Sequence, residues 1–384
     1  MTAAVGPKIK LQYFADTLSE IVSTIRTLVE IESPSDNKSA VDRLSGVVAD
    51  KFSAVGGKVR IHQSNEFGNH LQIDFTSQVS AKPVLLLGHY DTVYPVGTLN
   101  TMPCRDDADK LLGPGVLDMK SGIALMIHAI RGLQEWNGEL PRPVSVLLVS
   151  DEEVGSASSR PITEDLAKKA TAVLVLEAPY GLHGALKTRR KGVGEYLIKV
   201  TGNAAHSGLD FEKGANAIVE LARQIEKIAG FTDLDKGLTL NVGRVSGGSR
   251  TNVVPAEAAA QVDVRIARMK DAAEVEKKMY GLRVVNRKCK IEVSGGMNRP
   301  PMERTIGVAA LYKKAASIAH DLGWKLEEAA VGGGSDGNFT AALGIPTLDG
   351  LGGVGDGAHA IHEYILISEL PRRAALLAGL IEKA

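Results

Sequence analysis

The chain has 384 residues, and its 45 lysines and arginines are balanced by 45 aspartates and glutamates, so the formal net charge at pH 7 is zero. This balance excludes an overall charge that would attract nucleic acid or an acidic membrane surface, and it favours a small-molecule substrate. The length exceeds what one hydrophobic core usually supports, so we expect two domains.

Cysteine usage and the start of the chain bear on the compartment. The chain contains only Cys104 and Cys289, which lie far apart. Their spacing supports neither a disulfide framework nor a thiolate zinc site, and it fits a reducing compartment. The first ten residues lack the apolar stretch of a signal peptide, and no window has the length of a membrane span. We therefore expect a cytoplasmic protein without a membrane partner.

Helix-like and strand-like segments alternate along residues 1–190. Apolar residues recur at helical spacing over residues 11–47, with a break at residues 33–35, which predicts two helices. A third helix is predicted for residues 118–133. Five apolar runs predict strands: 58–62, 71–75, 84–87, 144–149 and 172–176. Nearly continuous apolar strands that alternate with helices are typical of an α/β fold whose largely parallel sheet is flanked by helices.

The pattern changes over residues 191–300, which predict an inserted α+β domain with the order β-α-β-β-α-β. Its predicted segments are 195–201, 215–228, 238–245, 258–266, 272–281 and 290–294. The pattern of residues 1–190 returns over residues 301–384, with a helix over 305–322, a glycine-rich turn at 332–334 and a final helix from Glu369. We therefore predict one α/β domain made of residues 1–190 and 301–384, interrupted by the insertion.

Metal-ligating side chains lie at the ends of the predicted strands or in the turns after them. The five candidates are His89, Asp118, Glu153, Glu177 and His359. Zinc binds imidazole nitrogen and carboxylate oxygen, and a pair of ions needs one bridging carboxylate. Two Zn²⁺ would be nearly neutralised by three carboxylates and a bridging hydroxide. The pattern therefore predicts a two-metal hydrolase.

Two further acids have predicted roles beside the ligands. Asp91 follows His89 by two residues, and a carboxylate on the far ring nitrogen would orient that imidazole. Glu152 precedes Glu153, and adjacent residues in a turn point in different directions, so Glu152 could act as general base. The alternative is that the acidic pair is a solvated turn or complements a helix N-terminus, and Asp118 could also cap the helix that follows it.

Six motifs in this order resemble the two-zinc aminoacylase and glutamate carboxypeptidase family of metallopeptidases, over almost the whole chain. They are Gly88-His89-Tyr90-Asp91-Thr92-Val93, Gly113-Pro114-Gly115-Val116-Leu117-Asp118-Met119-Lys120-Ser121-Gly122, Asp151-Glu152-Glu153-Val154-Gly155-Ser156, Leu176-Glu177-Ala178-Pro179, Gly202-Asn203-Ala204-Ala205-His206-Ser207-Gly208 and His359-Ala360-Ile361-His362-Glu363. The resemblance implies a zinc-peptidase catalytic domain with an inserted lid or dimerisation domain.

The resemblance also implies roles for the ligands. It implies two Zn²⁺ per subunit bridged by Asp118, which is followed by a non-proline cis peptide, with Glu152 as general base. Cobalt or manganese could occupy similar ligands. We choose His359 over His362 as the last ligand, because the family ligand stands four residues before a glutamate, here Glu363.

In the inserted domain, His206 matches a family histidine that reaches the substrate carbonyl, often across a dimer interface. The resemblance therefore implies a homodimer in which His206 stabilises an oxyanion. Asn252 and Arg299 stand where relatives bind the free carboxylate of the substrate. The glycine-rich turn lacks the Lys-Ser/Thr of a phosphate loop, so we predict a tight bend at Gly334 that lets substrate approach closely.

The expected activity is zinc-dependent cleavage of a peptide or N-acyl amide bond next to a free carboxylate. A deacylase of N-acyl amino acids or a dipeptidase of the same family is the first alternative, and a catalytically inactive zinc-binding protein is the second. Glutamate-specific relatives carry a lysine soon after the Glu177-Ala178-Pro179 motif. Here the basic residues, Lys187 among them, stand at shifted positions, so the preference for glutamate stays open.

Overall fold

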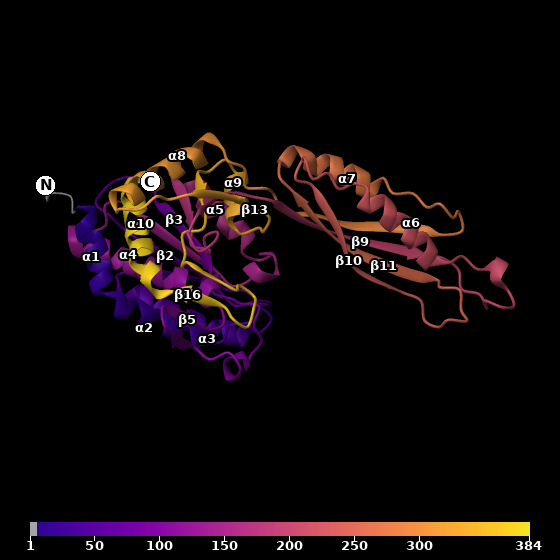
Figure 1. Cartoon of the computed structure of the whole chain (residues 1–384), viewed down its shortest axis with the longest axis horizontal. Helices are drawn as coiled ribbons and strands as arrows, with labels where there is room; N and C mark the ends of the chain where they lie inside the picture. Colours follow the sequence, from indigo (N-terminus) through magenta and orange to yellow (C-terminus); the bar gives the residue numbers. More distant parts are fainter. Residues whose placement is uncertain (1–5) are drawn as a thin grey trace. The chain divides into compact units, whose positions relative to one another are not determined.

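The computed structural model describes residues 6–384, which form two compact units (Figure 1). The first unit combines the chain up to Arg189 with Arg304–Val331 and Ser335–Ala384, and the second contains Arg190–Glu303 and Gly332–Gly334. Within residues 6–384, no helix has both the length and the apolar character needed to cross a membrane. The boundaries predicted at residues 190 and 300, and the role of the insertion as a lid or dimerisation domain, stay predictions.

A six-stranded sheet with the order β1-β2-β6-β3-β7-β14 forms the centre of the first unit. Its strands are β1 (Lys58–His62), β2 (His70–Phe75), β3 (Val84–His89), β6 (Val144–Val149), β7 (Ala172–Val175) and β14 (Thr347–Leu348). The four strands from β6 to β14 run parallel, and β1 and β2 are added antiparallel at one edge. The predicted α/β class with a largely parallel sheet is confirmed.

Helices cover both faces of this sheet. They are α1 (Pro7–Asp16), α2 (Leu18–Val29), α3 (Lys38–Ala54), α4 (Ser121–Asn137), α5 (Arg160–Lys169), α8 (Ile306–Asp321), α9 (Gly337–Ala342) and α10 (Leu370–Lys383). Along β3, Leu86 belongs to the core under α4 and α10, whereas Leu85 and Leu87 belong to the core beside α5. Because side chains alternate between the two faces of a strand, cover on both faces requires the continuous apolar runs seen in the sequence.

Two predicted helix boundaries were wrong. Residues 11–47 contribute to three helices instead of two, because the first breaks at Thr17, whose side chain donates to the Tyr13 carbonyl at 2.9 Å. The helix predicted from Asp118 starts at Ser121, since Asp118 and Met119 have non-helical backbone angles. Asp118 is therefore not a helix cap.

Two small sheets complete the first unit. One has the order β15-β16-β5-β4, formed by β15 (Gly355–Asp356), β16 (Tyr364–Leu366), β5 (Lys110–Leu112) and β4 (Arg105–Asp107). The other pairs β13 (Glu328–Val331) with β8 (Leu186–Arg190). In the first small sheet, Tyr364 is paired with Leu112, so the segment that carries His359 lies beside the segment that carries Asp118.

The second unit is an antiparallel sheet with two helices. Its elements in chain order are β9 (Gly192–Thr201), α6 (Ala217–Ala229), β10 (Thr239–Gly247), β11 (Glu257–Ile266), α7 (Ala272–Tyr280) and β12 (Lys290–Arg299). The strand order is β10-β11-β9-β12. Figure 1 shows α6 and α7 along this sheet. Burial alternates along β9 and β11 because one face packs on the helices and the other is polar.

Candidate metal centre

Three parallel strands carry predicted site residues to one edge of the central sheet. His89 is the last residue of β3 and pairs in register with Val149, the last residue of β6. Glu152 and Glu153 follow β6 within four residues, and Glu177 follows the end of β7 by two. The carboxyl ends of parallel strands meet at the same edge, which is where open α/β sheets commonly place their ligands.

Asp118 lies between the two predicted histidine ligands. Its Oδ1 lies 3.1 Å from His89 Nε2, and its Oδ2 lies 3.3 Å from His359 Nε2. Each carboxylate oxygen therefore faces a different imidazole, as a carboxylate that bridges two metal ions would. The Asp118–Met119 peptide bond is cis, as predicted.

Each histidine also faces a second carboxylate. Glu177 Oε1 lies 3.5 Å from His89 Nε2, and Glu153 Oε2 lies 3.2 Å from His359 Nε2. Ligand atoms of His89, Asp118 and Glu153 lie within 4.8 Å of one another, and so do those of His89, Glu152 and Glu177. The structure thus brings the five predicted ligands and Glu152 together.

Glu363 holds the backbone around Asp118. Its fully buried carboxylate accepts the N–H groups of Gly115 at 3.0 Å, Leu117 at 2.7 Å and Asp118 at 2.9 Å. Tyr94 donates its hydroxyl to the same carboxylate at 2.6 Å. In the sequence Glu363 served only as a reference point for choosing His359, so its contacts with the backbone around Asp118 were missed.

Tyr94 also contacts the segment that carries His359. Tyr94 Oη lies 3.1 Å from the carbonyl oxygen of Ala360, which directly follows His359. His359 itself has a left-handed backbone with a φ of 63°, a conformation that costs free energy for a residue with a side chain. About half of its side chain is exposed, so this predicted ligand lies at the open side of the cluster.

Asp91 connects the His89 imidazole to the acidic turn. The nearest acceptor to His89 Nδ1 is the main-chain oxygen of Asp91 at 3.0 Å, while the predicted carboxylate contact is longer at 3.4 Å. The Asp91 carboxylate also accepts the backbone N–H groups of Glu152 at 3.4 Å and Glu153 at 3.2 Å. One buried carboxylate thus contacts both the imidazole of a predicted ligand and the turn that carries the predicted base.

The ionisable groups strongly affect one another. Burial opposes a charge on Asp118, but hydrogen bonds with His359 and His89 outweigh it and hold the pKa of Asp118 well below its usual range. Hydrogen bonds with Asp118 and Glu153 raise the pKa of His359 to about 10. Burial opposes the charged form of His89 too, yet the surrounding carboxylates raise its pKa. The site therefore attracts positive charge, which a divalent cation would supply in place of protons.

The donor set fits a metal ion. Glu153 Oε1 is buried and has no hydrogen-bond partner within the described chain. A buried carboxylate oxygen without a donor is costly, and a cation would compensate it. The other donors are two imidazole nitrogens and carboxylate oxygens, which suit zinc and neighbouring divalent metals.

The predicted residues of the second unit form two pairs. His206 is exposed, and its Nδ1 accepts backbone N–H groups from Gly208 at 3.1 Å and Leu209 at 3.2 Å. The ring proton of a neutral imidazole must then lie on Nε2, which makes that atom a donor. The neighbouring Ser207 donates its N–H to the Asn252 carbonyl at 3.0 Å, so these two predicted loops lie together.

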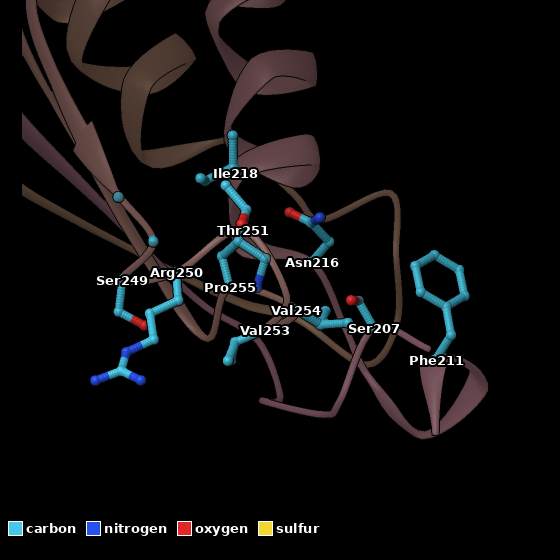
Figure 2. A pocket seen from close by; sticks show the side chains of 12 residues that line it. Ser207, Phe211, Asn216, Ile218, Ser249, Arg250, Thr251, Val253, Val254 and Pro255 are labelled. Carbon is cyan, nitrogen blue, oxygen red and sulfur yellow. The ribbon is translucent and has the colours of Figure 1, made fainter. Parts of the chain in front are cut away.

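The second pair is Arg299 and Gly334. Arg299 is only 6% exposed, and a Cβ at Gly334 would lie 3.0 Å from Arg299 Cδ. Neighbouring side chains therefore lie close to this glycine, and the close approach of substrate there stays a prediction. Elsewhere in this unit, a pocket of about 510 Å³ lies beside the His206 loop, and its lining includes Ser207, Asn216 and Arg250 (Figure 2).

Comparison with known proteins decides the family. Residues 85–383 match Peptidase family M20/M25/M40. The chain belongs to this family. Carboxypeptidase G2 of Pseudomonas sp. (strain RS-16) is 30% identical over 379 residues, covering 96% of this chain and 90% of the relative. The predicted relationship to glutamate carboxypeptidase-like peptidases is thereby confirmed.

Solved structures share the fold of this M20/M25/M40 peptidase. A tripeptidase from Staphylococcus aureus has a TM-score of 0.79 at 24% identity, over 95% of this chain and 98% of that one. An M20 family metallo-carboxypeptidase from Sulfolobus solfataricus has a TM-score of 0.74 at 18% identity, over 94% and 98%. Family membership makes the chain a metallopeptidase that hydrolyses peptide bonds.

Proposed function

We propose that this M20/M25/M40 peptidase is a zinc-dependent enzyme that cleaves a peptide or N-acyl amide bond next to a free carboxylate. The observation that carries the proposal is the position of Asp118, whose two oxygens face two histidines at 3.1 and 3.3 Å. His89 with Glu177 would hold one ion, and His359 with Glu153 the other, with Asp118 shared. Lewis-acid activation of a carbonyl and of water is the chemistry that such ions supply when bound.

Glu152 is the proposed general base. A carboxylate oxygen of Glu152 lies within 4.8 Å of ligand atoms of His89 and Glu177, and its backbone N–H donates to the Asp91 carboxylate. In this position Glu152 would take a proton from the attacking water and pass it to the leaving amine. The adjacent Glu153 faces His359 instead, so the dipeptide would divide proton transfer and ligation between its two members.

His206 is the proposed oxyanion donor. The two backbone N–H groups on its Nδ1 leave the proton on Nε2, so the ring can donate to developing negative charge without being cationic. We propose that it serves the active site of a second copy in a homodimer. Sedimentation should then give a dimer, and mixing His206→Ala with Glu152→Gln protein should restore part of the activity that each variant lacks alone.

Asn252 and Arg299 are the proposed partners of the substrate carboxylate, with Gly334 beside Arg299. Asn252 is exposed on the loop that contacts Ser207, next to His206. A guanidinium can donate two parallel hydrogen bonds to a carboxylate. Substrates whose C-terminal carboxylate is amidated should consequently be poor, and the loss should appear mainly in KM.

A paired substitution tests the base. Glu152→Gln should retain bound metal and lose activity by at least about 100-fold, the range expected for a general base. Glu153→Gln is the matched control, because it should lose metal as well as activity. Full turnover by metal-loaded Glu152→Gln would remove the assignment.

A panel of dipeptides, C-terminally varied peptides and N-acyl amino acids separates the carboxypeptidase from a dipeptidase or deacylase. Metal binding without hydrolysis of any member of the panel would identify an inactive protein.

A further inference from the structure

Ser35 lies between α2 and α3, outside the motifs that carry the predicted metal ligands. Pro34 forms an isolated parallel bridge with Thr92, in which Thr92 donates its backbone N–H to the Ser33 carbonyl at 2.8 Å and accepts the backbone N–H of Ser35 on its own carbonyl at 3.2 Å. All three residues of the segment are buried. Pro34 fixes its own φ, so the segment is held rigidly against the chain that follows His89.

The Ser35 hydroxyl is aimed at Asp91. Ser35 Oγ donates to Asp91 Oδ2 at 2.7 Å, and the Asp91 side chain is fully buried. This is shorter than the contacts of the same carboxylate with Glu153 N at 3.2 Å, and with Glu152 N and His89 Nδ1 at 3.4 Å each. The three longer contacts join Asp91 to residues of the candidate metal centre, whereas the shortest joins it to residues 33–35.

A buried carboxylate that has several acceptor positions can rotate among its donors unless one of them is fixed. A hydroxyl that donates to a charged acceptor makes a short and strong hydrogen bond, and the backbone of Ser35 is held in place by its N–H bond to the Thr92 carbonyl. The orientation of Asp91 in turn sets the position of the His89 imidazole and of the turn at Glu152 and Glu153. Partners at this distance from a metal tune both its affinity and its reactivity.

We propose that Ser35 is a positioning residue of the metal centre: its hydroxyl fixes the Asp91 carboxylate, which holds the His89 ligand and the backbone of the Glu152-Glu153 turn together. The inference rests on the proposed function in so far as it concerns catalysis. Its effect on metal binding stands independently of the substrate.

The test is Ser35→Ala in the full chain. Zinc affinity, measured by competition with a chromophoric chelator, should fall about 10-fold, and kcat should fall by about the same factor while KM changes little. Ser35→Thr keeps a hydroxyl and should recover most of both losses.

Ser33→Ala is the matched control, because Ser33 is also buried in the same segment and donates its hydroxyl to the Tyr90 carbonyl at 2.7 Å. It should lower the melting temperature of the metal-free protein about as much as Ser35→Ala does, yet keep the zinc affinity. Unchanged zinc affinity in Ser35→Ala, or an equal loss in Ser33→Ala, would overturn the proposal. If the parent protein hydrolyses nothing, the proposed function fails, and the zinc titration still decides on Ser35.

Discussion

Glu363 Oε1 accepts the backbone N–H of Asp118 at 2.9 Å, although 245 residues separate the two in sequence. The same carboxylate accepts two further N–H groups of this turn, so three backbone donors converge on one buried anion. Burial raises the pKa of Glu363 and so opposes its charge, whereas these donors stabilise the ionised form. The position of Asp118, the predicted bridging residue, thus depends on a residue that is not among the predicted metal ligands.

Glu363→Gln should therefore disturb the centre without removing a ligand. An amide presents N–H groups where the carboxylate presented an acceptor, so at least one backbone donor loses its partner. We expect metal affinity to fall about 10- to 100-fold and the free energy of unfolding to fall by about 1–3 kcal/mol. Tyr94→Phe removes a single donor and should have a smaller effect on both quantities. Wild-type zinc affinity in Glu363→Gln would show that the Asp118 turn holds itself.

The meeting of His89, Glu153 and Glu177 could be predicted, because each follows an apolar run and parallel strands end at one edge of the sheet. The contribution of Glu363 could not be predicted in this way, since hydrogen bonds to backbone N–H groups leave no periodic pattern. The same holds for Ser35, which read only as part of a break between helices. Sequence motifs predicted the metal ligands, whereas the residues that fix the positions of those ligands can be identified only from tertiary contacts.

The two boundaries that failed have different physical origins, one local and one tertiary. The helix pattern runs through Thr17 without interruption, whereas in the structure Thr17 has a non-helical backbone and donates its side chain to the Tyr13 carbonyl. The start of α4 was predicted too early because Asp118 resembles a helix cap, while in the structure its backbone N–H is bound by Glu363. The local sequence around Asp118 could not reveal that its N–H is bound by Glu363, which is distant in sequence.

Metal stoichiometry should follow the division of the ligands around Asp118. His359→Ala and Glu177→Gln each alter the set around a different oxygen of Asp118, so each variant should keep about one metal equivalent under conditions that saturate the parent with two. Asp118→Ala should lose both. Metal analysis after exhaustive dialysis provides the measurement. Retention of two equivalents by Asp118→Ala would contradict the bridging role.

Stability in mild acid should depend on His128, which is not one of the predicted ligands. His128 is buried on α4, with Nε2 3.0 Å from Thr24 Oγ1. Burial, helped by the charge of Arg131, lowers its pKa to about 4. Near pH 7 the ring is neutral in both states, but below pH 6.5 only the unfolded state takes up a proton. This group should therefore lower the free energy of unfolding by about 2 kcal/mol between pH 7 and pH 5.

His128→Gln should remove that part of the pH dependence, measured by denaturant unfolding of metal-free protein at both pH values. His320→Gln is the control, because 89% of the His320 side chain is exposed, and it should follow the parent curve. A parent and a His128→Gln variant that lose the same stability between pH 7 and pH 5 would contradict the assignment.

Gly352 contacts the backbone of the predicted ligand Glu177 and should not tolerate a side chain. Its N–H donates to the Glu177 carbonyl at 2.8 Å, and a Cβ would lie 2.3 Å from the Leu176 carbonyl oxygen. The segment cannot easily retreat, because the buried Arg373 holds the Gly352 carbonyl at 3.0 Å. Gly352→Ala should therefore displace the backbone of Glu177, lower the free energy of unfolding by about 1–3 kcal/mol, and reduce metal affinity.

Gly46→Ala provides the comparison for this substitution. Gly46 lies exposed inside α3, where a Cβ would meet nothing within 4 Å. Alanine there restricts the unfolded chain and suits the helix, so it should raise stability by about 0.5–1 kcal/mol and leave metal binding unchanged. Opposite signs for the two glycines, read from denaturant unfolding, are the expected result. A Gly352→Ala protein that is as stable as the parent and binds metal normally would mean that the loop can move without carrying Glu177 with it.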